Sequence, residues 1–396
     1  MRNIRYRAAA MLLIIFVLCL FGCERQANGG QWNQQGYKDT AFSDAGFYYT
    51  DNGYLCFLDT KTGVNVYLCS RPGCTHGGTK GDEKVCDAHL SVSSVYSTMG
   101  FWDGHLYYIE DQAQYGSVVM RRNADGTAET KVAELCQQYL NKDSTAEVTE
   151  MIIADGYLYY AVTVRAIIET EPNVHVEKPV LYAVSCVDLR TGNDTELYAD
   201  QTFTTLIAAK DSTVLFETRD YPSSDDPDFQ EKIKSYRVCL KQWSRENNQT
   251  EVLLETTLDE HGQYNEFRDG KIYYSKYVND TPIRSCYDLE KRKLETGLDI
   301  PTYRETRIND LYAIRKYSGS DTYVIHNSKT GKEMEAYLPK MFSIHAVGKQ
   351  GFTLRGREVS ENGNITHTEY YVSFASLSDG MQKDDLIPFY ISNYNG

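Results

Sequence analysis

The stretch Asp155-Gly156-Tyr157-Leu158-Tyr159-Tyr160 decides the fold of this 396-residue chain. Asp-Gly supplies the two positive backbone angles of a tight hairpin turn, and the residues that follow alternate between the two faces of a strand. The apolar run Glu150-Met151-Ile152-Ile153-Ala154 precedes the turn and is predicted to be the partner strand. The local unit is therefore a β-hairpin.

Six further stretches repeat this pattern along the chain. Two are nearly identical to the first: Asp103-Gly104-His105-Leu106-Tyr107-Tyr108 and Asp269-Gly270-Lys271-Ile272-Tyr273-Tyr274. Four weaker copies begin at Asn52, Asp211, Asn309 and Lys349. Successive copies lie 40 to 58 residues apart in the printed sequence. This spacing indicates seven repeated units.

A second turn follows most copies and adds another pair of strands. The second turns are Lys61-Thr62-Gly63, Asp125-Gly126-Thr127, Arg190-Thr191-Gly192, Lys329-Thr330-Gly331 and Asn362-Gly363-Asn364. Two hairpins per unit give four strands. The chain also has 32 tyrosines, a residue type that favours half-buried strand surfaces. The sequence therefore predicts an all-β fold, a β-propeller of seven four-stranded blades. A run of β-sandwiches is the alternative, but it would not repeat one hexamer at blade-like spacing.

A propeller ring must also close between its first and last blades. We expect either the N-terminal segment 36–49 or the C-terminal strand 386–391 to complete a blade shared by both ends of the chain.

The repeats resemble those of known propeller families. The segments 55–63 and 187–192 look like quinoprotein repeats, yet the docking tryptophan after each Thr-Gly and a vicinal cysteine pair are missing, which argues against a bound quinone. The same segments resemble degenerate repeats of the low-density-lipoprotein-receptor (YWTD-like) β-propeller. The chain resembles more closely lipoproteins of Gram-positive bacteria that carry such a propeller and have no known function.

The N-terminal sequence predicts that the mature protein lies outside the cytoplasm. Arg2, Arg5 and Arg7 precede an apolar run that ends in Leu20-Phe21-Gly22-Cys23, which resembles the lipobox of bacterial lipoproteins. That resemblance implies a signal peptide at residues 1–22 and fatty acylation, such as palmitoylation, of Cys23. A flexible linker is expected at 23–37 and the propeller at 38–396. The protein would then be lipid-anchored at the extracytoplasmic face of the cell membrane.

Charge restricts the partners of the mature chain. The net charge is −14, and loss of the three arginines of the signal peptide would make it −17. Phosphate groups would repel such a chain, so nucleic acid is not an expected partner. Attachment to the membrane would have to come from the lipid anchor.

A cysteine- and histidine-rich insertion at 69–89 interrupts the repeat and is expected on an inter-blade loop. Cys69, Cys74, His76 and Cys86 have spacings that could wrap a tetrahedral ion, with Pro72-Gly73 as a turn and His89 as a substitute ligand. These four residues are the predicted ligands of one structural zinc ion. Four protein ligands leave no open position for catalysis at such a site.

Other states of this insertion are open from the sequence. Cysteines outside the cytoplasm are more often disulfides, and each of the three pairings among Cys69, Cys74 and Cys86 leaves one thiol over. Unpaired thiols are a further alternative.

The sequence contains no zinc-protease, nucleophile-elbow, phosphate-loop or dinucleotide motif. We therefore expect a binding or scaffolding module for an extracellular protein, peptide or glycan. The alternative is an extracytoplasmic hydrolase or lyase that acts on a glycan or peptide at one mouth of the propeller channel. Buried, pKa-perturbed carboxylates or a His-Tyr pair at that mouth would favour the enzyme.

Overall fold

The computed structural model describes residues 33–34, 40–51, 53–74, 76, 86–90, 98–112, 116–171, 174–223, 226–268, 270–278, 281–298, 303–309, 311–317, 322–339, 341–348, 350–359 and 365–394. The chain divides into two units, Met1–Trp32 and Asn33–Gly396. The predicted signal peptide and Cys23 lie outside the described residues. Within the described part, no helix is long and apolar enough to cross a membrane.

Seven antiparallel sheets form the second unit, each containing four strands that are consecutive in sequence, and one of them has β1 as a fifth strand. Blade I has β2 (Thr40–Phe42), β3 (Gly46–Asp51), β4 (Tyr54–Asp59) and β5 (Asn65–Tyr67). Blade II has β6 (Met99–Trp102), β7 (His105–Gln112), β8 (Gly116–Asn123) and β9 (Thr130–Glu134). Blade III has β10 (Ser144–Ala154), β11 (Tyr157–Glu171), β12 (Val174–Asp188) and β13 (Asp194–Asp200).

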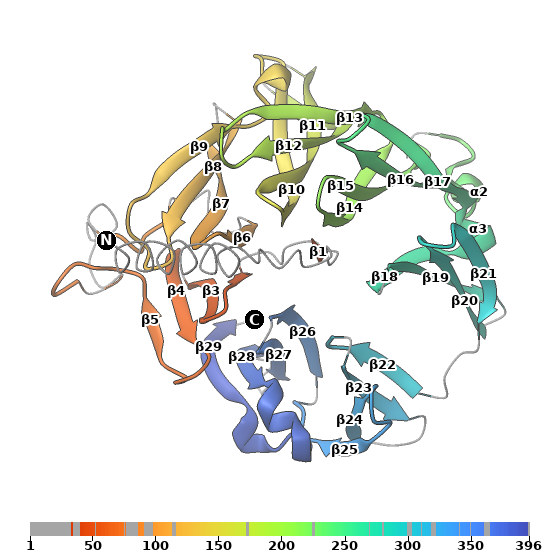
Figure 1. The fold of residues 1–396 in the computed structure, drawn as a ribbon. Coiled ribbons are helices and arrows are strands. Elements are labelled where there is room, and N and C mark those ends of the chain that lie inside the picture. The colour runs from red at the N-terminus through yellow and green to blue at the C-terminus, as the bar shows by residue number, and fades with distance from the viewer. Residues whose placement is uncertain are drawn as a thin grey trace, which may run out of the picture. The chain divides into compact units, whose positions relative to one another are not determined.

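The remaining four blades continue in the same order around the ring (Figure 1). Blade IV has β14 (Phe203–Lys210), β15 (Thr213–Arg219), β16 (Arg237–Ser244) and β17 (Gln249–Thr257). Blade V has β18 (Gln263–Arg268), β19 (Lys271–Val278), β20 (Thr281–Asp288) and β21 (Lys293–Leu298). Blade VI has β22 (Tyr303–Arg307), β23 (Tyr312–Tyr317), β24 (Tyr323–Asn327) and β25 (Glu333–Ala336). Blade VII has β26 (Met341–Val347), β27 (Gly351–Val359), β28 (Ile365–Ser373) and β29 (Ile387–Tyr394). The predicted seven-bladed propeller is confirmed.

Most turns of the two predicted families lie at the same end of the blades. The predicted second turn at 362–364 is an exception: it lies outside the described residues, between β27 and β28, the second and third strands of blade VII. At Asp155-Gly156 both residues have positive φ, 47° and 81°, and the turn joins the first and second strands of blade III. Arg190-Thr191-Gly192 joins the third and fourth strands. We call this end of the ring the turn face. The opposite end, where second strands lead to third strands and each blade leads to the next, is the hairpin face.

One predicted repeat copy has a different place in its blade. The turn at Asn52-Gly53 joins the second and third strands of blade I, whereas the other copies join first and second strands. The first turn of blade I is instead 43–46, where Ser43 accepts hydrogen bonds from the backbone N–H groups of Ala45 and Gly46. The sequence Phe47-Tyr48-Tyr49 after it supplies the aromatic alternation.

Alternate residues of each blade pack against opposite neighbours. On β11, Leu158, Tyr160 and Val162 join the core shared with blade II, while Tyr159 and Ala161 join the core shared with blade IV. All five are fully buried, because a blade inside the ring has a blade on each side. Period-two alternation therefore fills two inter-blade cores at once.

Ring closure differs from the prediction. Among the described residues, no blade is shared by the two ends of the chain, because β2–β5 and β26–β29 each form a four-stranded sheet. The two blades close by packing: the rings of Phe47 and Tyr49 lie 5.0 and 4.9 Å from that of Phe389. The side chain of Asn65 also donates a hydrogen bond to the Phe389 carbonyl over 3.1 Å.

Phe389→Ala should therefore weaken the closure. We expect a loss of about 2 kcal/mol in the free energy of unfolding, from lost apolar burial and ring contacts. Urea unfolding measures this, with Tyr337→Ala as control because Tyr337 is exposed. Equal stability of Phe389→Ala and the wild type would contradict closure by this packing.

A short N-terminal strand lies on the inner side of the ring. β1 (Asn33–Gln34), within the predicted linker, pairs antiparallel with β14, the innermost strand of blade IV (Figure 1). Asn33 is opposite Ala209 and Gln34 is opposite Ala208. Since β14 runs from the hairpin face to the turn face, β1 runs from the turn face towards the hairpin face.

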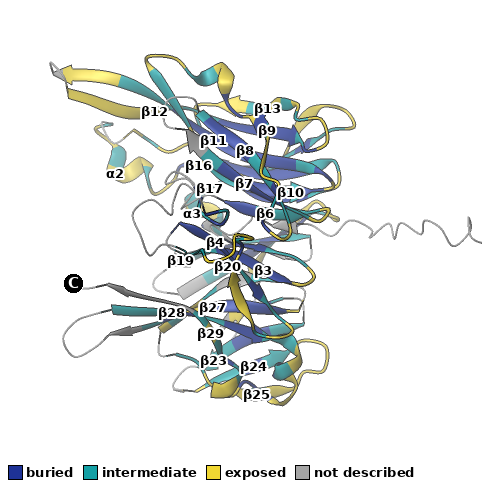
Figure 2. Cartoon of the chain, turned by 90° about the vertical axis from the view of Figure 1, so that its left-hand side faces the viewer, coloured by how far each residue is buried: buried dark blue, intermediate teal, exposed yellow. Residues whose placement is uncertain are grey.

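The two faces differ in their connections. The hairpin face carries the segment between β5 and β6, the long ribbon of β11 and β12, and the connection 220–236 with α2 (Phe229–Lys232). Figure 2 shows the exposed end of the ribbon and α2 on the same side of the ring. The turn face has mostly tight turns, and its long connection, 374–386, belongs to blade VII.

Candidate metal centre

The structure brings the four predicted ligands together. Cys69, Cys74, His76 and Cys86 each place one donor atom within 4.8 Å of the others. They lie between β5 and β6, so the predicted inter-blade position of the insertion is confirmed. Residues 75 and 77–85 of the insertion lie outside the described part. The four side chains could hold a metal ion.

A β-turn aims the first two thiols at one point. Pro72 and Gly73 occupy its central positions, and the Cys74 N–H donates to the Arg71 carbonyl over 3.3 Å. Gly73 has φ of +73°, which L side chains rarely adopt, so glycine is required there. The local sequence thus folds the chain back and sets Cys74 beside Cys69.

His76 is held in an uncommon backbone conformation. Its φ is 49°, in the left-handed region that non-glycine residues seldom occupy. The imidazole stacks on Tyr67, with ring centroids 4.7 Å apart, and its Nδ1 lies 3.5 Å from the Cys86 Sγ. Tyr67 therefore packs against the His76 imidazole, which lies beside the Cys86 thiol.

Asp87 joins the two loops that carry the cysteines. Its carboxylate accepts hydrogen bonds from the Ser70 hydroxyl and the Arg71 Nε, both over 2.8 Å. These contacts hold the pKa of Asp87 below its usual value. Its backbone carbonyl accepts from the buried Arg122 guanidinium of β8. The cluster is therefore tied to blade II by a residue 35 positions further along the chain.

The thiols have unequal proton affinities. Burial and the neighbouring Cys74 thiol raise the pKa of Cys86 to about 12. Burial also opposes ionisation of Cys69, but the N–H groups of Arg71 and Asp87 outweigh it and lower the pKa of that thiol. Backbone N–H groups aimed at a thiolate stabilise the form that binds metal.

His89, the predicted substitute ligand, makes other contacts in the structure. His89 forms a β-bridge with Tyr54, and the two rings lie 5.3 Å apart at a steep angle. It is outside the group of four donors. The eight cysteines of the described residues, including Cys69, Cys74 and Cys86, are thiols.

Three thiols and an imidazole are a typical donor set for tetrahedral zinc. Four protein donors complete that geometry, so the arrangement can fix the connection between blades I and II and leaves no position for an activated water. The sequence pattern identified these donors. It did not identify Tyr67, Ser70, Asp87 or Arg122, although three of them are adjacent to predicted ligands or two residues away.

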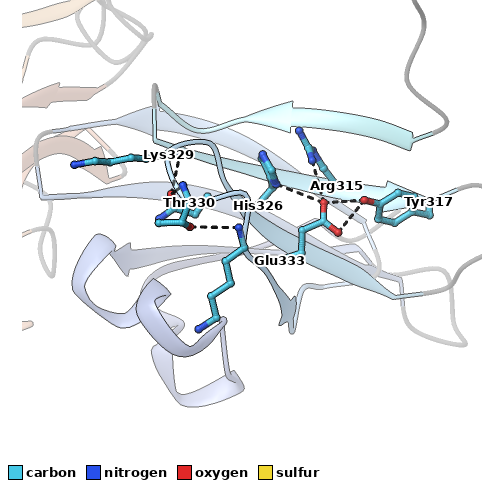
Figure 3. A network of polar contacts seen from close by, with 8 residues as sticks. Arg315, Tyr317, His326, Lys329, Thr330 and Glu333 are labelled. Atoms are coloured by element: carbon cyan, nitrogen blue, oxygen red, sulfur yellow. Dashed lines mark hydrogen bonds and ion pairs between the residues drawn. The ribbon is translucent and has the colours of Figure 1, made fainter.

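A second polar cluster contains the residue types expected of an acid–base site. In blade VI the Glu333 carboxylate accepts hydrogen bonds from the Tyr317 hydroxyl at 2.7 Å and the Arg315 guanidinium at 2.9 Å (Figure 3). His326 Nδ1 lies 3.5 Å from the same carboxylate. Burial opposes ionisation of Glu333, but Tyr317 and Arg315 outweigh it and lower its pKa. These residues lie on β23, β24 and β25, the three strands after the innermost one, so they are not at the mouth of the channel.

Comparisons with known proteins concern the fold. No protein-family model matches this sequence, and no curated protein matches it. An oligogalacturonate lyase from Vibrio parahaemolyticus is 10% identical, with 83% of this chain and 88% of that chain covered and a TM-score of 0.45. An acylaminoacyl peptidase from Pyrococcus horikoshii is 10% identical, with coverages of 90% and 52% and a TM-score of 0.49. A nidogen/laminin complex is 8% identical, with coverages of 76% and 91% and a TM-score of 0.33. The assignment of a propeller rests on the seven sheets themselves.

Proposed function

We propose that this protein is a lipid-anchored, extracytoplasmic binding module. Cys23 would carry the lipid, and the hairpin face would meet an extracellular protein, peptide or glycan. The difference between the two faces of the ring carries this proposal. Connections of variable length and composition gather on the hairpin face, and such connections on a rigid scaffold are where binding usually occurs.

In this proposal a zinc ion bound by Cys69, Cys74, His76 and Cys86 is structural. It would fix the connection between blades I and II, which is a long segment of the hairpin face without regular strands among its described residues. The proximity of the four donors and the hydrogen bonds of Asp87 support this role.

Cys23→Ser tests the anchor. In a bacterium that processes lipoproteins, we expect the wild type in the membrane fraction and labelled by a palmitate analogue. The serine variant should leave that fraction and lose the label, because it has no thiol to acylate. Cys19→Ser is the matched control and should stay in the membrane, since Cys19 lies within the predicted signal peptide. Retention of Cys23→Ser in the membrane fraction would overturn the proposed anchor.

Screening the full-length protein in detergent micelles against glycans and peptides tests the binding role. Product detection belongs in the same assay. Binding without turnover is expected, and turnover of any of these compounds would replace the binding module with the hydrolase or lyase.

A further inference from the structure

Four aromatic side chains form a continuous row across blades III and IV. The ring of Tyr182 lies 5.4 Å from that of Phe203, Phe203 lies 5.6 Å from Tyr221, and Tyr221 lies 4.6 Å from Tyr236. Each step is within the range of favourable aromatic pairs. We call Tyr182, Phe203, Tyr221 and Tyr236 the aromatic row.

The aromatic row lies on the hairpin face. Phe203 begins β14 and is paired with Arg219, the last residue of β15. Tyr182 is opposite Asp200, the last residue of β13. Tyr221 and Tyr236 stand at the start and end of the connection that holds α2, on the side where Figure 2 shows that helix.

Exposure changes along the row. Tyr221 is 41% exposed, Tyr182 and Phe203 are half-buried, and Tyr236 is only 6% exposed. Tyr236 and Phe203 flank Tyr221 and fix its position, so a ligand that packs on this ring would restrict little further motion. Rigid aromatic anchors of this kind supply contact area at a low entropic cost.

Two arginines beside the aromatic row are each paired with a carboxylate. Arg219 binds Glu217 over 2.6 Å and donates to the Tyr221 hydroxyl over 3.1 Å. Arg165 binds Glu147 over 3.2 Å. Arg165 also lies near Tyr182, where burial raises the pKa of the tyrosine and the guanidinium opposes that rise. Each cation has its own carboxylate, so neither is an unpaired charge available to an anionic ligand.

We propose that the aromatic row binds a neutral saccharide chain. A sugar ring has an apolar face of C–H groups that can pack on Tyr221 and a rim of hydroxyls that need both donors and acceptors. Arginine only donates and an ionised glutamate only accepts, so the Arg165–Glu147 pair, whose side chains are 32% and 55% exposed, supplies both. An acidic ligand would need an unpaired guanidinium, which neither pair beside the row provides. The inference rests on the proposed binding function and names its ligand class.

Titration calorimetry with the full-length protein in detergent micelles tests this site. The probes are hexasaccharides of glucose, mannose, xylose and N-acetylglucosamine, with a proline-rich peptide as a competing class because such peptides also use aromatic grooves. At least one saccharide should bind. Tyr221→Ala should weaken it by about tenfold, which corresponds to about 1.4 kcal/mol. Tyr221→Phe keeps the ring and should stay within about threefold of the wild type.

Tyr337→Ala is the matched control. Tyr337 is also an exposed tyrosine, 48% exposed, but it follows β25 in blade VI, so its loss should leave saccharide affinity unchanged. The proposal is overturned if no saccharide binds, if Tyr221→Ala binds as tightly as the wild type, or if only the peptide depends on Tyr221. Membrane attachment through Cys23 has a separate readout, so its result is independent of these outcomes.

Discussion

Cys86→Ser is expected to abolish zinc binding and to destabilise the connection between blades I and II. The wild type should contain about one zinc ion per chain, and the variant below about a tenth of that, because three donors remain where a closed tetrahedral site needs four. At a free-metal concentration 1,000 times the dissociation constant, a bound ion stabilises the fold by about 4 kcal/mol. The variant should lose this increment. Metal analysis by mass spectrometry and urea unfolding measure the two effects.

Cys239→Ser is the matched control for this experiment. Cys239 is a buried thiol of β16, 6% exposed, and is outside the group of four donors. It makes the same change from sulfur to oxygen, so zinc content should stay at the wild-type level. Thiol counting on the wild type distinguishes the metal site from the disulfide alternative. Absence of zinc together with oxidised Cys69, Cys74 or Cys86 would contradict the metal site.

Acid should release the ion from the wild type. Thiols bind zinc as thiolates, so protons compete with the metal for each sulfur. In the absence of metal, burial raises the pKa of Cys86 to about 12, which makes that proton a strong competitor. The metal's contribution to stability is therefore present at neutral and alkaline pH and is lost as the pH falls. Zinc retained equally at all pH values would contradict thiolate ligation.

The blades could be predicted from the sequence because their signals are local. The Asp155-Gly156 turn and the alternation in Tyr157-Leu158-Tyr159-Tyr160 involve neighbouring residues, and similar signals recur in most blades. The position of a turn within its blade is less local. Asn52-Gly53 is a turn pair of the same kind as Asp155-Gly156, but it falls between the second and third strands of blade I, since register also depends on the strands on either side.

Ring closure and the aromatic row depend on contacts that no spacing reveals. Phe47 and Phe389 are 342 positions apart, and only the completed ring brings them together. The aromatic row similarly joins residues from Tyr182 to Tyr236 across two blades. The metal ligands could be predicted from their spacing, because Cys69 to Cys86 lie within one connection and the Pro72-Gly73 turn places Cys74 beside Cys69. The spacing of the ligands did not indicate Arg122, which contacts the cluster from β8 through the Asp87 carbonyl.

Glu217→Ala should destabilise the protein by about 3–5 kcal/mol, the usual cost of removing one partner from a buried ion pair. Glu217 is fully buried on β15, and its Oε1 accepts from the Arg219 Nε over 2.6 Å. The Arg219 side chain is 17% exposed, so without the carboxylate its guanidinium would stay largely out of water and unpaired. Urea unfolding of the variant and the wild type measures the loss.

Replacing both partners separates the burial of a charge from loss of packing. Glu217→Leu with Arg219→Met removes both charges and keeps apolar volume, so it should restore most of the stability lost in Glu217→Ala. Glu134→Ala is the exposed comparison, because Glu134 and Lys131 are each about half exposed in their pair and the cost should stay below about 1 kcal/mol. If Glu217→Ala is as mild as Glu134→Ala, water reaches Arg219 and the pair is not buried. If the double variant is as unstable as Glu217→Ala, the loss comes from the shape of the site rather than from an unpaired charge.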